Sequence, residues 1–80
     1  MLEVNKTAQR ISPGKNRGCL KRVEKATGLR YETMTAWRIR GFHLVSYPCV
    51  LLWAILDVLA EEGLLDCVLK KAKKLVNEAR

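Results

Sequence analysis

The sequence is short of the residues that support most catalytic and metal-binding chemistry. Its 80 residues include one histidine and three cysteines, and no two cysteines form a Cys-x-x-Cys pair. Structural zinc needs four ligands at tighter spacing, so His43 and Cys49 do not predict a metal site. There is no Ser-His-Asp arrangement, and the adjacent Glu61 and Glu62 point to different faces of a predicted helix. The sequence therefore predicts neither an enzyme nor a cofactor.

The cysteine count is odd, so a disulfide framework would leave one thiol unpaired. A reduced cytoplasm, with the cysteines as small apolar fillers, is the simpler interpretation. The polar N-terminus lacks the apolar stretch of a signal peptide. The longest uncharged run, residues 41–56, is shorter than the roughly 20 apolar residues of a membrane span. We therefore expect a soluble cytoplasmic protein, with no membrane partner and no small-molecule substrate.

Glycine and proline are also scarce, at five and two residues, which favours long regular elements with few turns. The apolar fraction of 49% is typical of a folded protein, and 80 residues allow one small domain. Charge is unevenly distributed. Residues 1–43 carry ten Lys/Arg and three Asp/Glu, a net charge of +7, whereas residues 44–80 carry five of each. This asymmetry predicts one half that binds a polyanion and a neutral half for packing or assembly.

The spacing of the apolar residues predicts an all-α fold of four to five helices. Glycine follows three of these helices, and Ser46 with Pro48 marks the start of another. Residues 42–47 form a connection that could contain a short extended piece. The helix after Ser46 is apolar on nearly all sides, so we expect it to be buried on most of them. The predicted helices cover residues 1–11, 18–27, 31–40, 46–62 and 64–80.

Residues 18–41 carry the functional signal, because two short helices joined by a turn with glycine form a helix-turn-helix unit. Gly28 lies where the chain turns. The outward face of the second helix, residues 31–40, is then free to enter a DNA major groove. The inward positions of the unit are apolar or small: Val23, Ala26, Leu29, Met34 and Trp37.

The run Ala26-Thr27-Gly28-Leu29, followed by Met34, Trp37 and Gly41, resembles the lambda-repressor/Cro superfamily. It is most similar to the small phage regulators of the Cro/CII type, over residues 18–60. The resemblance implies a phage or prophage repressor or activator that binds double-stranded DNA. Glu24 stands where the family usually has alanine, so either the register shifts or the two helices pack at an altered angle.

The roles that the resemblance implies divide the polar residues into two groups. Phosphate contacts by Lys and Arg fix the register on DNA, whereas polar groups on one helix face read base edges. The residues expected to read bases are Arg30, Tyr31, Glu32, Thr35, Ala36 and Arg40. Those expected to contact the DNA backbone are Arg17, Lys21, Arg22 and Arg38.

The neutral half, residues 46–80, offers more apolar surface than one small chain can cover, which predicts a homodimer. Trp37 and Trp53 are expected in the core rather than as stacking platforms for single strands, and the lysines of residues 70–74 form a solvated helix face. One alternative function stays open. A helix-turn-helix scaffold could bind an acidic protein surface with its basic face, as a phage-encoded inhibitor would.

Overall fold

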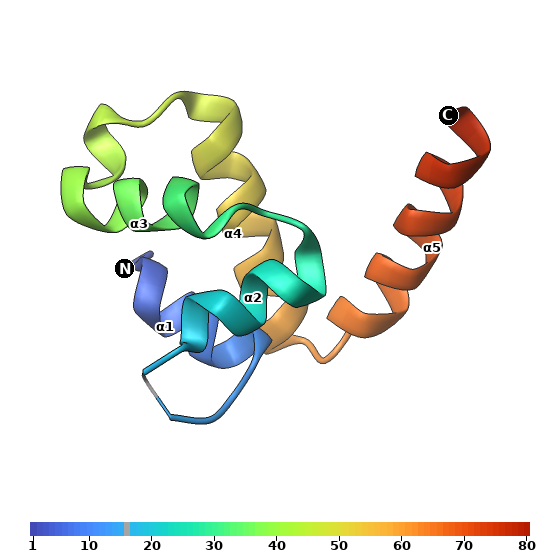
Figure 1. The fold of residues 1–80 in the computed structure, drawn as a ribbon, viewed down its shortest axis with the longest axis horizontal. Coiled ribbons are helices and arrows are strands. Elements are labelled where there is room, and N and C mark those ends of the chain that lie inside the picture. The colour runs from blue at the N-terminus through green and yellow to red at the C-terminus, as the bar shows by residue number, and fades with distance from the viewer. Residues whose placement is uncertain (16) are drawn as a thin grey trace.

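The computed structural model describes residues 1–15 and 17–80, and it confirms the predicted all-α fold (Figure 1). These residues form five α-helices and one short 3₁₀-helix, with no β-strand among them. The bounds of the helices lie close to those predicted from the apolar spacing. The elements are α1 (Val4–Ile11), α2 (Cys19–Thr27), α3 (Tyr31–Arg40), η1 (Phe42–Leu44), α4 (Tyr47–Glu61) and α5 (Leu65–Ala79).

Glycine ends α2 and α3, as the sequence predicts. Gly28 and Gly41 both have φ of 82°, in the region that L-residues with a side chain rarely adopt. The Gly28 N–H donates to the carbonyl of Glu24 at 2.8 Å, and the Gly41 N–H donates to the carbonyl of Trp37 at 3.0 Å. Each helix therefore closes its last turn before the chain changes direction.

The connection between α3 and α4 is helical at its start, so the prediction of an extended piece within residues 42–47 is wrong for its first half. The Leu44 N–H donates to the carbonyl of Gly41, and the Val45 N–H donates to the carbonyl of Phe42, both at 3.2 Å. These i→i+3 bonds wind Phe42–Leu44 into a 3₁₀ turn. The turn brings Phe42 against the core, and Val45 alone follows in an extended conformation.

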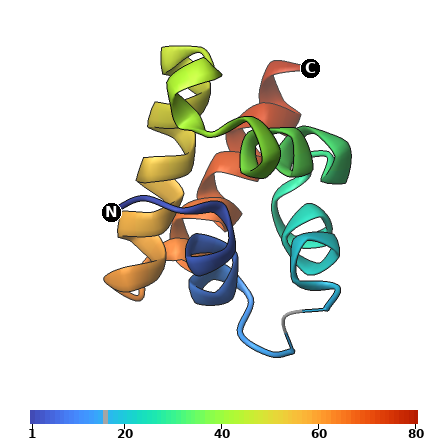
Figure 2. The same cartoon turned by 90° about the vertical axis from the view of Figure 1, so that its left-hand side faces the viewer.

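Helices α1 to α4 enclose a small core, and α1 lies between α2 and α4 (Figure 2). Val23, Met34 and Trp53 are completely buried. Trp37 is also buried, as predicted, and its ring meets that of Trp53 edge-on, with 5.7 Å between the ring centroids. T-shaped aromatic pairs of this kind contribute beyond their buried area. The tryptophan pair therefore joins α3 to α4.

A polar contact fixes α1 to α4. Thr7 is buried in the α1 face, and its hydroxyl donates to Oδ1 of Asp57 at 2.7 Å. The guanidinium of Arg10 lies 2.8 Å from both oxygens of the same carboxylate. Because a buried hydroxyl costs free energy unless it is paired, Asp57 gives Thr7 the partner that this position requires. The basic N-terminal helix is thereby part of the folded body.

The expectation that α4 is buried on most sides is wrong for the single chain. Trp53 and Leu56 are buried, but Leu51, Ile55 and Val58 remain between 44% and 54% exposed along the opposite face. The reason is geometric: one 15-residue helix has neighbours on the α1 side, and the rest of the described chain does not reach around it.

Helix α5 projects away from the other four helices (Figure 1). Its first turn is anchored by the buried Leu65, and Leu69 is half-buried one turn later. Further along, the Lys73 ammonium donates to the carbonyl of Ala26 at 2.8 Å. The remaining apolar residues of α5 stay exposed, so this helix presents an uncovered stripe to the solvent.

Candidate nucleic-acid interface

The turn between α2 and α3 is fixed by local hydrogen bonds. Its three residues, 28–30, follow Thr27, whose hydroxyl donates to the carbonyl of Val23 at 2.8 Å and accepts the N–H of Leu29 at 3.2 Å. Leu29 packs against the core, as predicted for the residue that fills the space between the two helices. The direction of α3 relative to α2 is thus set within a few residues.

The helix-turn-helix unit has Glu24 at a position where alanine is expected, and the structure gives this glutamate a hydrogen-bonding role. Its carboxylate reaches across the turn and accepts the N–H of Tyr31 at 2.9 Å. That N–H belongs to the first turn of α3, where backbone donors have no partner inside the helix and where negative charge is favourable. Glu24, although it lies in α2, therefore caps the N-terminus of α3.

The outward face of α3 lies opposite the buried Met34 and Trp37. Arg30, Glu32 and Arg40 are exposed, whereas the other three predicted base readers are half-buried: Tyr31, Thr35 and Ala36. Ile39 is 75% exposed on the same helix. This exposure agrees with the prediction that Ile39 is one of the outward residues of this helix that are free to enter a groove, although Ile39 was not among the expected base readers.

The hydroxyl of Thr35 is covered, although the residue is on the outward side of α3. Its oxygen has almost no accessible surface and no hydrogen-bond partner within residues 1–15 and 17–80. In this rotamer the hydroxyl group is not offered to a base edge. A hydrogen bond from Thr35 to a base would require rotation about its side-chain torsion. That rotation would also expose the hydroxyl and so end the free-energy cost of burying it unpaired.

One side of α3 borders a basic hollow of about 250 Å³. Arg17 comes from the loop before α2, Lys21 comes from α2, Tyr31 and Arg38 come from α3, and Asn5 comes from α1. The Lys21 ammonium lies 4.6 Å from the centre of the Tyr31 ring, a cation–π contact that holds it beside α3. Three of the four predicted backbone-contacting residues therefore meet here, and Asn5 joins them without any signal in the sequence.

The other side of α3 borders a wider hollow of about 430 Å³. Glu32, Ala36 and Arg40 contribute from α3, and residues 44–46 contribute from the connection to α4. The predicted base readers are thus spread over the full outward width of α3, with Tyr31 on one flank and Arg40 on the other.

Arg22 has a role that the sequence did not reveal. Its guanidinium donates to the carbonyls of Ser12, Lys15 and Arg17 at 3.3, 2.8 and 3.5 Å. These bonds tie Ser12, Lys15 and Arg17 to α2. They use three of the five N–H donors of the guanidinium, so Arg22 is a positioning residue for Ser12, Lys15 and Arg17.

We expect Arg22→Ala to lower the free energy of unfolding by about 1–2 kcal/mol, because hydrogen bonds from a charged group are lost and two of the three are solvent-exposed. Arg17→Ala removes the same charge but leaves the Arg17 carbonyl in place. Chemical denaturation followed by circular dichroism compares the two. Equal stability of both variants would show that the loop does not depend on the Arg22 bonds.

The exposed basic side chains around α3 are electrostatically uncompensated. In the described part of the chain, no ion pair forms at Arg17, Arg30, Arg38 or Arg40, and the ion pairs present join Lys6 to Glu3 and Arg10 to Asp57. The carboxylate of Glu24 is occupied by the α3 backbone. Glu32 is the one acidic residue of α3 and is exposed, so the four arginines leave this face with a net positive charge suited to a polyanion.

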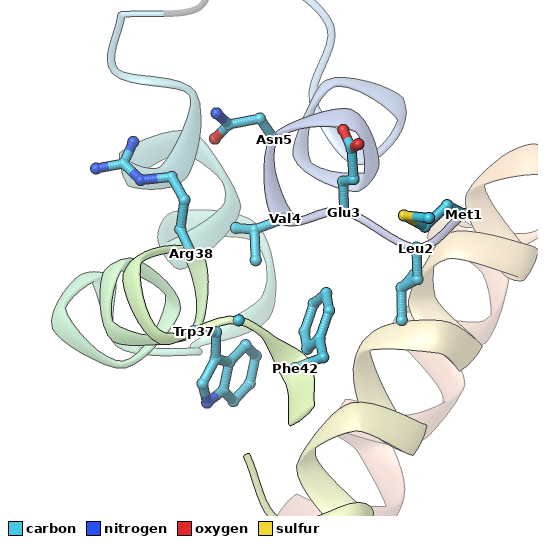
Figure 3. Close-up of a pocket in the computed structure, with 9 residues that line it drawn as sticks. Met1, Leu2, Glu3, Val4, Asn5, Trp37, Arg38 and Phe42 are labelled. Carbon is cyan, nitrogen blue, oxygen red and sulfur yellow. The ribbon is translucent and has the colours of Figure 1, made fainter. Parts of the chain in front are cut away.

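An apolar pocket of about 390 Å³ lies beside the end of α3, under the N-terminal residues (Figure 3). Leu2 and Val4 point toward the rings of Trp37 and Phe42, while Arg38 stands at the rim. The N-terminal segment thus covers part of the α3–η1 junction. No role could be predicted for this N-terminal segment, because its contacts come from the tertiary fold.

Residues 1–15 and 17–80 contain no helix that combines the length and apolar character needed to cross a bilayer. They also bring together no group of three or more His, Cys, Asp or Glu side chains suited to a metal ion. Comparison with known proteins finds no matching family model and no significantly similar curated protein or solved structure.

Proposed function

We propose that this protein is a sequence-specific transcription regulator that binds double-stranded DNA, with α3 in the major groove. The observation that carries the proposal is the exposed face of α3 between two flanks that hold uncompensated arginines and a lysine. A helix of 10 residues is about 15 Å long, and the major groove is wide enough to admit an α-helix.

The two kinds of DNA contact are supported by different residues. On the flank beside α2, the shared hollow of Arg17, Lys21 and Arg38 supports phosphate contacts, which fix the register without reading sequence. On the outward face, Arg30 suits a guanine, and the exposed Ile39 suits the methyl group of thymine. Three of the four predicted backbone contacts are thus kept, Arg22 is assigned to the fold, and Ile39 is added to the predicted base readers.

The resemblance to the phage Cro/CII-type regulators supports a repressor or activator of a phage or prophage, acting in the cytoplasm. The exposed apolar residues of α4 and α5 support a homodimer. A two-fold symmetric dimer would match a palindromic operator with half-sites about one helical turn apart.

Selection of duplexes from a random library tests the proposal directly. We expect the protein to enrich a short palindromic sequence and to bind it more tightly than random duplex at physiological salt. If no sequence is enriched, and an acidic protein competes more strongly than any duplex, the basic face binds protein instead.

We expect Lys21→Ala to weaken binding to all duplexes alike and to reduce the slope of log affinity against log salt by about one unit, because one counterion fewer is released. Lys70→Ala, which removes the same charge from the exposed side of α5, is the matched control and should leave the slope unchanged. Fluorescence anisotropy at several salt concentrations measures both. An unchanged slope for Lys21→Ala would remove this residue from the interface.

A further inference from the structure

The exposed stripe of α5 has a regular spacing. Val68, Ala72, Leu75 and Ala79 follow one another at intervals of four, three and four residues, and all four are on the side that the rest of the chain leaves uncovered. Val68 is 38% exposed and Leu75 is 66% exposed. Intervals of three and four residues are those of a helix seam that packs against another helix.

The order of large and small residues along this stripe is self-complementary. When two copies of α5 lie antiparallel, Val68 of one faces Ala79 of the other, and Ala72 faces Leu75. Each large side chain then meets a small one, which lets the helices approach closely. When the copies lie parallel, each residue faces its own counterpart, so layers of paired alanines alternate with layers of paired large residues.

The charges beside the stripe favour the same orientation. Lys71 precedes Ala72 and Glu78 precedes Ala79, so both flank the stripe on one side, and both are exposed. In the antiparallel arrangement Lys71 of each copy lies next to Glu78 of the other, giving two ion pairs. In the parallel arrangement neither residue meets an opposite charge.

We propose that α5 is the dimerisation element of this protein and pairs antiparallel with α5 of a second copy, with the two-fold axis between residues 73 and 74. The exposed stripe of α4 is a weaker candidate for this contact, because Leu51, Ile55 and Val58 are all large and offer no small partner positions. The pairing rests on the homodimer proposed above but not on DNA binding, so it is tested in the absence of DNA.

Cysteine cross-linking determines the orientation. In a Cys67→Ser background, which removes the exposed native thiol of α5, the double variant Val68→Cys/Ala79→Cys should form a disulfide-linked dimer on mild oxidation. Each single variant should not, because two copies of one position lie 11 residues apart along the antiparallel pair, about 17 Å. A disulfide needs Cα atoms within about 7 Å.

The background protein itself, which retains Cys19 and Cys49, should give no covalent dimer. Cross-linking of each single variant would show a parallel pair and would overturn the proposal. Failure of the double variant to cross-link would overturn it as well.

Sedimentation provides a second test that does not depend on thiols. Leu75→Glu should convert the dimer to a monomer while leaving the helical circular dichroism intact, because this side chain is largely exposed within one chain. Asn77→Glu changes the charge equally on the exposed side of α5 away from the stripe and should remain a dimer. A wild-type protein that is monomeric at tens of micromolar, or a dimeric Leu75→Glu variant, would contradict the pairing.

Discussion

Trp37→Ala should lower the free energy of unfolding by about 3–5 kcal/mol, the range for removing a large aromatic side chain from a core. Trp37 is 7% exposed and contacts the ring of Trp53 edge-on. Its loss would open a cavity between α3 and α4 and would remove the aromatic pair. At 0.05–0.15 kcal/mol per residue, an 80-residue domain has a total stability of roughly 4–12 kcal/mol, so much of the protein would unfold at 37 °C.

The matched control lies two residues further along the same helix. Ile39 is 75% exposed, and Ile39→Ala should change the stability by less than about 0.5 kcal/mol, as surface substitutions do. Urea denaturation followed by far-ultraviolet circular dichroism measures both variants without relying on tryptophan fluorescence. A Trp37→Ala protein within about 1 kcal/mol of wild type would show that the tryptophan pair does not hold α3 to the body.

The helices could be predicted from the sequence because their ends are marked by residues with strong local preferences. Gly28 and Gly41 adopt positive φ, and Pro48 occupies the first turn of α4. The apolar spacing between these marks fixed the inward side of α3, so the burial of Met34 and Trp37 was predictable as well. Local backbone preferences and apolar spacing were therefore sufficient to predict the helix ends and the inward side of α3.

Features that depend on tertiary contacts were not predictable in the same way. The sequence shows Arg22 as one more cation in a basic segment, whereas the fold places loop carbonyls around its guanidinium. Likewise, the sequence shows Glu24 as a residue out of place, and only the turn geometry brings its carboxylate to the N–H of Tyr31. Asn5 reaches the basic hollow because Thr7 and Arg10 fix α1 through Asp57.

The expected burial of α4 failed for a different reason. Its composition predicts a helix that is buried on most sides, but composition does not say whether the same chain supplies the cover. The exposed Leu51, Ile55 and Val58 show that one 80-residue chain does not supply enough apolar surface to cover this helix.

Arg30→Ala should have the largest effect on sequence recognition. Arg30 is exposed immediately before the first turn of α3, where a side chain that enters the groove meets base edges first. A bidentate contact from arginine to guanine contributes about 1–3 kcal/mol of discrimination. The affinity for the selected operator should therefore fall by about 5- to 150-fold, while the affinity for random duplex changes little.

The ratio of operator affinity to random-duplex affinity is the measurement that tests the major-groove role of α3 most directly. It is determined by anisotropy titration at one salt concentration for wild type, Arg30→Ala and the equally charged control Lys70→Ala. We predict a ratio that falls for Arg30→Ala by about 5- to 150-fold and stays at the wild-type value for Lys70→Ala. A ratio that is unchanged in Arg30→Ala would contradict base reading by Arg30 at the start of α3.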